Sequence, residues 1–193
     1  MSNTSHSVQV VVAYDFSPSS ELALARAIEI AARAPQHVLH IVAALDPHER
    51  AIGPLTGVTY ETAERIQKLV LECVTKAFHG RKSAAEIKFF VHARIGKAAT
   101  EVLQLAREVG ADLIIIGSHG KAGLERLVLG SVSEQVVREA RCPVIVARDK
   151  TYPEVQRLDV FRYDHTRTKH REPHCYSYAN EQVITRPNDW PIG

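Results

Sequence analysis

The stretch that decides the fold is Asp112-Leu-Ile-Ile-Ile116, which runs directly into Gly117-Ser-His-Gly120. Four consecutive apolar residues between a charged residue and a glycine are typical of a strand that is covered on both faces of a parallel sheet. Because this is the most apolar stretch of the chain, we expect it to lie in the interior of the sheet. The glycines after it predict a turn whose backbone can approach another group closely.

Apolar strands and amphipathic helices alternate on both sides of this stretch. Further strands are predicted at 8–14, 37–45, 86–93 and 143–147, and the alternating pattern of 86–93 indicates an edge strand. The connecting segments are predicted as helices, the first with Ser17 as N-cap and Pro18 in the first turn, and the third ending at Gly110. This order predicts an α/β fold, an open five-stranded parallel sheet with helices on both faces.

The composition is that of an ordinary folded domain. The chain has 193 residues, of which 45% are hydrophobic, and 24 Lys and Arg residues balance 22 Asp and Glu residues. This balance argues against nucleic acid and anionic membranes as partners. No apolar run approaches the length of a membrane span, and Cys73, Cys142 and Cys175 form no CxxC pair. We therefore expect a cytoplasmic protein.

The regular pattern stops near residue 148, which predicts a domain over 1–148 and an irregular extension over 149–193. Four prolines in the extension exclude a long helix, yet half of the chain's aromatic residues lie there, which predicts that part of it docks on the domain or on a partner. Its potential metal ligands have a spacing that matches no closed zinc site, so no metal is expected: His165, His170, His174 and Cys175.

The segment from Gly117 to Ser133 is the strongest candidate for a ligand site. Ligands of open parallel sheets bind outside the carboxyl ends of the strands, where the strand order reverses. Gly130-Ser131 precedes a predicted helix, whose first N–H groups and positive dipole end suit a phosphate. The spacing is neither a Walker A loop nor the GxGxxG fingerprint.

Structural alternatives exist for most of these residues. Ser131 and Glu134 fit a capping box, and Asp15 fits a turn before Ser17. Cys73 and Cys142 lie on apolar faces and are expected in the core. Three residues of the glycine-rich segment are either phosphate contacts or ordinary surface residues: His119, Lys121 and Arg126.

The pattern Gly117-x2-Gly120-x9-Gly130-Ser131, with Asp15 at the end of the first strand, resembles the ATP-binding branch of the universal stress protein family over roughly residues 8–148. The resemblance implies a Rossmann-like fold, related to adenine nucleotide alpha hydrolases, with strand order 3-2-1-4-5. It also implies that Asp15 lies beside the adenosine, together with the end of the second strand near Ala43 or Ala44. The remaining implied contacts are the nucleotide loop, Gly117, His119 and Gly120, and the phosphate-binding residues, Gly130, Ser131, Val132 and Ser133.

The function expected from the resemblance is that of a regulatory protein in which ATP occupancy biases dimerisation or binding of an unidentified protein partner. Mg²⁺ is expected with the ATP because it offsets repulsion between the phosphates and Glu134. The exposed edge of the last strand, Val144 to Ala147, predicts a homodimer, and the family commonly pairs this strand. No enzymatic activity beyond slow hydrolysis is expected, since only His119 and Lys121 are candidates for phosphoryl chemistry.

Two other functions remain open at this point. The chain is either an interaction module with an idle nucleotide site that acts through its tail, or an enzyme of the adenylyl-transfer class. The turn after the first strand, Asp15-Phe-Ser-Pro-Ser-Ser, lacks the HxGH or SGGxDS-like loop of those enzymes and argues against the second.

Overall fold

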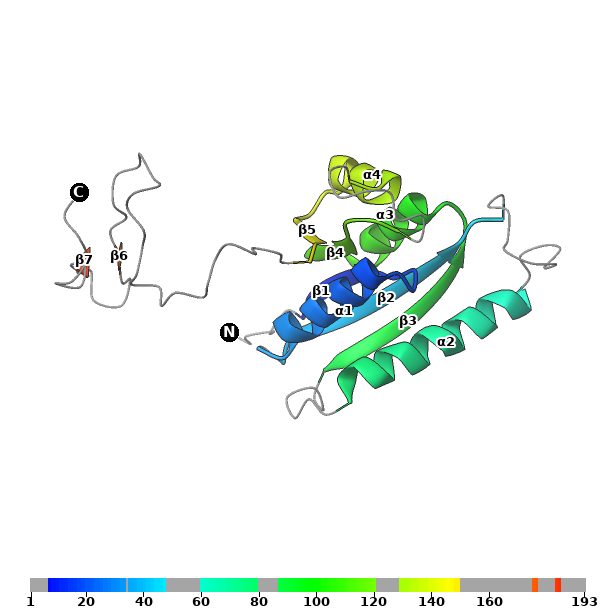
Figure 1. Ribbon diagram of the computed structural model, residues 1–193, viewed down its shortest axis with the longest axis horizontal. Helices are drawn as coiled ribbons and strands as arrows, with labels where there is room; N and C mark the ends of the chain where they lie inside the picture. Colours follow the sequence, from blue (N-terminus) through cyan, green and yellow to red (C-terminus); the bar gives the residue numbers. More distant parts are fainter. Residues whose placement is uncertain are drawn as a thin grey trace, which may run out of the picture. The chain divides into compact units, whose positions relative to one another are not determined.

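The apolar runs form a parallel sheet in the computed structural model, which describes residues 7–33, 35–47, 60–79, 87–120, 129–149, 175–176 and 183–184. The strand order is β3-β2-β1-β4-β5, so the predicted α/β fold and its 3-2-1-4-5 order are confirmed (Figure 1). The strands are β1 (Val8–Ala13), β2 (His37–Leu45), β3 (Lys88–Ile95), β4 (Leu113–Gly117) and β5 (Val144–Ala147).

Helices connect the strands and end where local sequence signals predict. Ser17 is the N-cap of α1, its hydroxyl accepts a hydrogen bond from the Ser20 N–H, and Pro18 occupies the first turn, as predicted. Gly110 ends α3 in the left-handed conformation with φ 62°, which glycine adopts without steric cost. The helices are α1 (Pro18–Ala31), α2 (Tyr60–Phe78), α3 (Ala98–Val109) and α4 (Ser131–Glu139).

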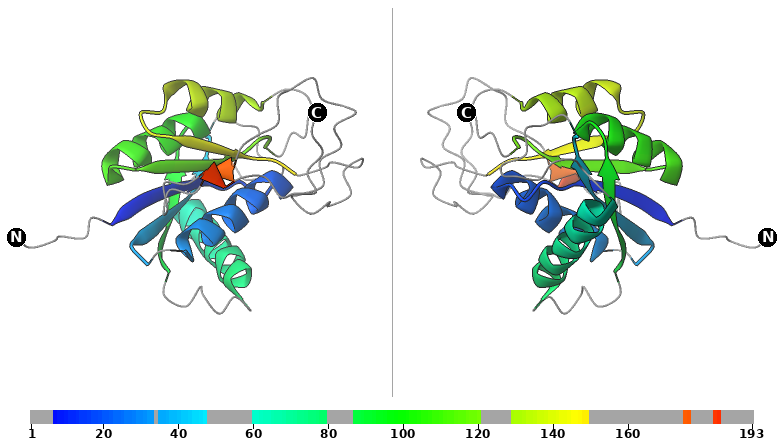
Figure 2. Two further views of the ribbon diagram at one scale, coloured as in Figure 1. Left: turned by 90° about the vertical axis from the view of Figure 1, so that its left-hand side faces the viewer. Right: turned by 90° about the vertical axis from the view of Figure 1, so that its right-hand side faces the viewer.

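The sheet separates two apolar cores because successive residues of β1 point to opposite faces. Figure 2 shows α1 and α2 on one face and α3 and α4 on the other. The first core joins β1 to α1 and α2, and its buried residues include Val10, Val12, Leu24, Ile28, Leu39, Val70 and Ile115. The second core joins β1 to α3 and α4, and its buried residues include Val11, Val102, Leu103, Ile114 and Val136.

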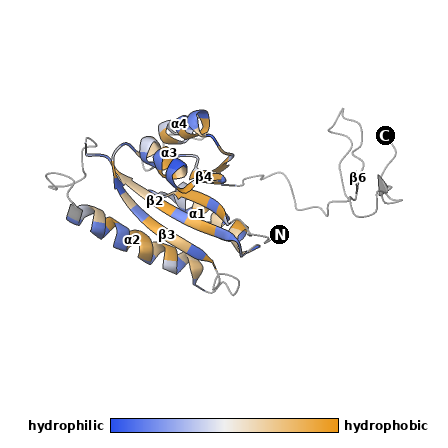
Figure 3. Ribbon diagram, turned by 180° about the vertical axis from the view of Figure 1, so that it is seen from behind, coloured by the Kyte–Doolittle hydropathy of each residue, from blue (hydrophilic) through white to orange (hydrophobic). Residues whose placement is uncertain are grey.

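The hydropathy of the elements follows their positions in these layers. In Figure 3 the strands are largely apolar, whereas the ribbon of α2 changes between hydrophobic and hydrophilic residues within each turn, as in a helix with one solvent-facing side. Cys73 of α2 packs against the first core and Cys142 against the second, but both are only partly buried, so the prediction that they are core residues is correct in position and overstates their burial.

The predicted positions of the strands in the sheet are confirmed, and the bounds differ by one residue at β1, β4 and β5 and by more at β3. β4 lies between β1 and β5, and β3 lies at an edge. The prediction of 86–93 for this edge strand is wrong by two residues at each end, because β3 pairs with β2 in a register that runs from Val38↔Lys88 to Leu45↔Ile95. The length of the partner strand, rather than the local pattern, sets the bounds of β3.

The chain divides into two compact units, Met1–Asp149 and Lys150–Gly193. Within the second unit, β6 (Cys175–Tyr176) pairs antiparallel with β7 (Val183–Ile184), and the irregular character of the rest of the extension stays a prediction. Two residues per strand are too few to produce a recognisable period. The histidines of the extension lie outside the described residues, and its predicted docking stays a prediction.

Within the described ranges, no helix combines the length and the apolar character that a membrane span requires.

Two leucines of α1 test how the helix is held. Leu24 is fully buried in the first core, whereas Leu22 is 37% exposed. We expect Leu24→Ala to lower the free energy of unfolding by about 2–5 kcal/mol and the matched Leu22→Ala by less than about 1 kcal/mol. Urea denaturation of both variants measures the difference, and equal losses would contradict the described packing of α1.

Candidate functional site

The candidate site lies at the carboxyl ends of β1 and β4, where the order of the strands reverses. β1 ends first: the Tyr14 N–H donates to the Val42 carbonyl at 2.9 Å, while β2 continues to Leu45 in register with β3. The backbone of Ala43 and Ala44 therefore extends past the end of the adjacent strand. The predicted contact residue Ala44 lies in this part of β2, beyond the end of β1.

Asp15 forms a tight turn directly after β1. Its Oδ1 accepts a hydrogen bond from the Ser17 N–H at 3.0 Å, and the intervening Phe16 has φ 64°, in the left-handed region that residues other than glycine rarely adopt. The other carboxylate oxygen faces Gly120, since a Cβ at Gly120 would lie 3.0 Å from Asp15 Oδ2. The structure thus brings Asp15 and Gly120 together and confirms the turn alternative for Asp15, while its contact with a ligand stays a prediction.

Tyr14, just before this turn, is buried and neutral. Its hydroxyl donates to the carboxylate of Glu21 on α1. Burial is the largest cause that raises the pKa of Tyr14, and hydrogen bonds with Glu21 and Cys73 raise it further. Tyr14 therefore serves as a fixed hydrogen-bond donor rather than as an acid–base group.

The turn after β4 is held by serine hydroxyls. The hydroxyls of Ser17 and Ser19 donate to the backbone carbonyl of His119, the Ser17 bond being long at 3.4 Å. Ser118 Oγ lies 2.9 Å from His119 Nδ1. The other ring nitrogen, His119 Nε2, is buried and has no hydrogen-bond partner among the described residues.

The sequence analysis missed the contributions of Ser17, Ser19 and Ser118 to this arrangement. The available signal was the run of hydroxyl residues after Asp15, in which only Ser17 has a predicted role, as the N-cap of the first helix. Because Ser19 and His119 are 100 positions apart, their contact depends on the pairing of β1 with β4.

Gly117 and Gly120 have different surroundings although both belong to the predicted loop motif. A Cβ at Gly117 would lie 2.7 Å from the backbone carbon of Ser19 and 2.8 Å from its oxygen. Gly117 therefore allows the first turn of α1 to pack against the end of β4. Gly120 is exposed, and among the described residues a Cβ there would meet only the end of the Asp15 side chain.

The start of α4 lies against the turn after β4. The Gly130 N–H donates to the Ser118 carbonyl at 2.9 Å. The buried Ser133 hydroxyl lies 2.8 Å from the Gly130 carbonyl and 3.1 Å from the Ser118 carbonyl. These bonds fix the N-terminus of α4 beside the end of β4.

The capping-box alternative for Ser131 is wrong. Gly130 is the N-cap of α4, and within the described residues no side chain caps it, so Ser131 is the first residue of the helix and is exposed. Glu134 extends toward Arg138, with 3.6 Å between the charged atoms, and Val132 packs against the second core. Lys121 and Arg126 lie outside the described residues.

The chemistry gathered here suits the binding of an anionic, hydrogen-bonding ligand. The first turn of α4 presents backbone N–H groups that have no partner within the helix, and its dipole favours negative charge. Asp15 and His119 add one carboxylate and one imidazole at the neighbouring strand ends.

Comparison with known proteins assigns the chain to a family. The profile of the universal stress protein family matches residues 8–148. The chain belongs to the universal stress protein family. The predicted membership of this family is thereby confirmed, while its ATP-binding branch and the roles of the individual motif residues remain predictions.

Relatives of this universal stress protein occur in archaea and bacteria. Universal stress protein MJ0531 of Methanocaldococcus jannaschii is 34% identical over 129 residues, which cover 62% of this chain and 76% of that protein. Universal stress protein A homolog 2 of Coxiella burnetii is 32% identical over 146 residues, which cover 74% of this chain and 95% of that protein.

Solved structures show the same fold. The structure of protein MJ0577 has a TM-score of 0.60 and 23% identity, covering 75% of this chain and 98% of that chain. A universal stress protein solved in complex with cAMP has a TM-score of 0.54 and 28% identity, covering 74% of this chain and 98% of that chain.

The two loop glycines of this universal stress protein yield a testable contrast. Gly117→Ala forces a methyl group into the backbone of α1, so we expect it to lower the free energy of unfolding by about 1–3 kcal/mol. Gly120→Ala displaces only a side-chain end and should change this free energy by no more than about 0.5 kcal/mol. Chemical denaturation compares them, and equal effects would show that the close contact with Ser19 is not a constraint.

Proposed function

We propose that this universal stress protein binds ATP together with Mg²⁺ at the carboxyl ends of β1 and β4, and that occupancy of the site regulates its association with itself or with a protein partner. The observation that carries the proposal is the uncapped start of α4 at Gly130, which the Ser118 and Ser133 hydrogen bonds hold beside Asp15 and Gly120. A 28% identical relative solved with cAMP supports an adenine nucleotide as ligand.

The phosphates are proposed to bind the first turn of α4. The N–H groups of Ser131, Val132 and Ser133 belong to the helix end that attracts anions. The Ser131 side chain is exposed, so its hydroxyl adds a further donor. A Cβ at Gly130 would lie 3.4 Å from the Cα of His119 and from the oxygen of Ser118, so glycine lets this helix end approach the β4 turn closely.

The adenosine is proposed to lie between the ends of β1, β2 and β4. Asp15 offers the carboxylate oxygen that faces Gly120, and Ala44 offers backbone groups beyond the end of β1. Gly117 shapes the turn through its contact with α1. The unpartnered Nε2 of His119 is the buried polar atom in this region that a bound ligand would satisfy.

Mg²⁺ is proposed to bind the phosphate oxygens and water rather than a set of protein ligands. Among the residues that the structure describes, no group of three or more His, Cys, Asp or Glu side chains is placed to hold a metal ion. Glu134 lies in the first turn of α4, so a cation on the phosphates would reduce its repulsion of them.

Regulation rather than rapid catalysis is proposed because a fast phosphoryl transfer needs a positioned base and a cluster of positive charge. Of the candidates, His119 is already hydrogen bonded through Nδ1, and Lys121 lies outside the described residues. The interaction module with an idle site remains the main alternative, and measurement of ATP binding separates the two.

Self-association is proposed to use β5. This strand lies at one end of the sheet and pairs, within the described residues, only with β4. Its outer backbone edge can therefore extend the sheet into a second copy.

The phosphate contact can be tested with a substitution that leaves the helix intact. Ser131→Asp adds a negative charge where the phosphates are proposed to bind, so ATP affinity should fall by about tenfold or more, equivalent to about 1.4 kcal/mol. The same charge is favourable for the helix dipole, so thermal stability should not fall. Calorimetric titration with Mg-ATP and a thermal melt measure both effects.

The matched control is Thr100→Asp, which places the same charge at an exposed position in the first turn of α3. It should leave ATP affinity unchanged. Equal affinity in wild type and Ser131→Asp would contradict phosphate binding at α4, and absence of ATP binding in the wild type would favour the idle-site alternative.

Removal of the extension tests the proposed domain boundary. A chain that ends at Lys150 retains β1 to β5 and all proposed contact residues. We expect it to fold, to remain a dimer in light scattering and to bind ATP within about threefold of the full chain, equivalent to about 0.7 kcal/mol. An unfolded truncated chain would show that the domain needs residues beyond 150.

A further inference from the structure

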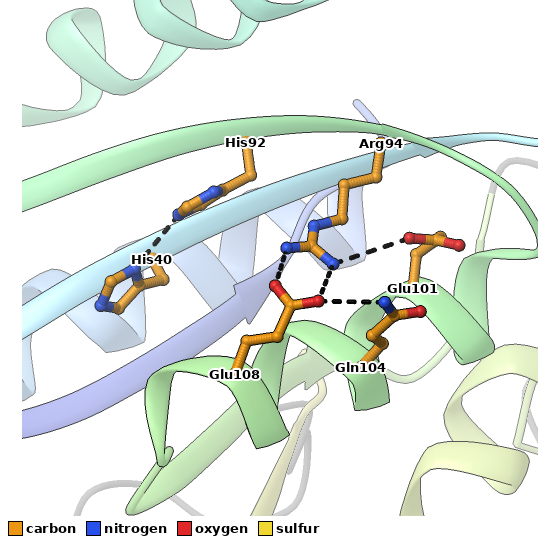
Figure 4. Close-up of polar contacts among 6 residues, drawn as sticks. All are labelled: His40, His92, Arg94, Glu101, Gln104 and Glu108. Atoms are coloured by element: carbon orange, nitrogen blue, oxygen red, sulfur yellow. Dashed lines mark hydrogen bonds and ion pairs between the residues drawn. The ribbon is translucent and has the colours of Figure 1, made fainter.

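Two histidines link three strands on the face of the sheet that carries α3. His40 on β2 and His92 on β3 are hydrogen bonded through Nδ1 and Nε2, respectively, at 3.1 Å (Figure 4). The Nε2 of His40 lies 2.8 Å from Oε1 of Gln9 on β1, and the Gln9 side-chain amide donates to the Ser7 carbonyl at 3.1 Å. A continuous chain of hydrogen bonds therefore runs from the edge strand β3 through β2 to β1.

The hydrogen bonds determine which nitrogens carry protons. Because the Gln9 amide nitrogen donates to Ser7, its oxygen accepts, so His40 carries a proton on Nε2. The Nδ1 of a neutral His40 then accepts, and His92 donates from Nε2. A single added proton can be shared, because neutral His92 can change tautomer and accept from His40. Protonation of both rings would place two N–H groups opposite each other and remove the side-chain hydrogen bond between β2 and β3.

The surroundings oppose protonation of either ring. His40 is only 7% exposed, and Phe90 stacks on it with 5.2 Å between ring centres. Burial lowers the pKa of His40. The pKa of His92 is lowered to about 4. Burial is the largest cause, the positive charges of His40 and Arg94 lower it further, and the negative charge of Glu108 opposes them with a smaller effect.

The nearby carboxylates are already engaged with other groups. Glu108 on α3 accepts two hydrogen bonds from the Arg94 guanidinium and one from Gln104, and Glu101 lies 3.8 Å from Arg94 (Figure 4). Asp112 accepts from the Gln9 backbone N–H at 2.8 Å. Lys88 shares this face of β3 by alternation and adds positive charge. These are the charged groups of the described residues that face the pair.

β3 and α2 form a unit that is attached to the rest of the domain through β2 and through the packing of α2 in the first core, where Val70 is fully buried. Within the described residues β3 pairs only with β2. α2 holds β3 through stacking of Phe78 on Phe89, with 5.1 Å between ring centres, and through a hydrogen bond from Gln67 to the Val91 carbonyl. Loosening of the β2–β3 contact therefore affects both elements together.

We propose that the His40–His92 pair is an acid-sensitive latch, which holds β3 and α2 on the sheet while both rings are neutral and releases this unit when the rings are protonated. The proposal is independent of nucleotide binding.

The direction of the effect follows from the difference between the released and the closed state. A released histidine has an ordinary pKa of about 6.5, so at about pH 5 it is mostly protonated, whereas the closed His92 is mostly neutral. The latch is fully effective above about pH 6.5 and weakens as the pH falls toward 4. For His92 alone, opening becomes about thirtyfold more favourable between about pH 7.5 and about pH 5.

Two cysteines on opposite sides of the sheet report whether the opening is local. Cys73 of α2 packs against the first core, and Cys142, just before β5, packs against the second. The full chain is labelled with a dipyridyl disulfide reagent, which reacts at acidic pH, and labelling at each cysteine is followed by peptide mass spectrometry. Rates are divided by those of the denatured chain at the same pH.

We expect the normalised rate at Cys73 to rise by about thirtyfold between about pH 7.5 and about pH 5, while the rate at Cys142 changes by less than about threefold. His92→Gln retains an N–H donor toward His40 but cannot be protonated, so it should remove most of the rise. His79→Gln replaces an exposed histidine just after α2 and should behave as the wild type.

Equal rises at Cys73 and Cys142, or an unchanged rise in His92→Gln, would overturn the proposal. A titration of the wild-type imidazole signals by nuclear magnetic resonance gives a second measurement that needs no variant. Midpoints of both rings below 6.5 support the latch, and a midpoint of either ring above 6.5 contradicts it.

Discussion

Burial of β1 on both faces is the constraint on which the rest of the structure depends. Val10, Val11 and Val12 are fully buried, and they alternate between the two cores. Neither set of side chains can leave water unless helices cover both faces of the sheet. The crossover connections that supply those helices bring the carboxyl ends of β1 and β4 together and separate the loops that follow them. The candidate site is thus a consequence of how the chain buries its central strand.

Most of the fold was predictable because its signals are local. Apolar runs mark the strands, and Ser17, Pro18 and Gly110 mark helix ends through conformational preferences that depend on few neighbours. The bounds of β3 were not predictable in the same way, because its pairing with β2 sets them. β6 and β7 are too short to produce a pattern.

The candidate site was predictable as a set of residues but not as a set of contacts. Ser131 and Glu134 fit a capping box in sequence, yet the helix begins one residue earlier than that assignment requires, with Gly130 as its cap. Ser133 and Gly117 are predicted ligand contacts, and the structure shows in addition what they do within the protein. The Ser133 hydroxyl is hydrogen bonded to the carbonyls of Gly130 and Ser118. Gly117 lacks a side chain and so lets the backbone of α1 pack against the end of β4. Such contacts join residues far apart in the chain and have no local signature.

The proposed site and the histidine pair share β2. Ala44 and His40 lie on the same strand, and Ala44 stands in register with Arg94, the residue that α3 holds through Glu101 and Glu108. β2 therefore carries backbone that faces the end of β1 as well as side chains that secure the edge of the sheet. A displacement of this strand would alter both regions at once.

The left-handed backbone of Phe16 affects the kinetics of binding as well as the shape of the turn. Its ring packs edge-on against Tyr14 with 5.1 Å between ring centres, and the Ser17 N–H bonds the Asp15 carboxylate across it, so the unusual conformation is held before any ligand arrives. A segment that is already ordered loses little conformational freedom on association. For a ligand that contacts Asp15, the rate of encounter on this side is therefore set by diffusion and not by rearrangement of the turn.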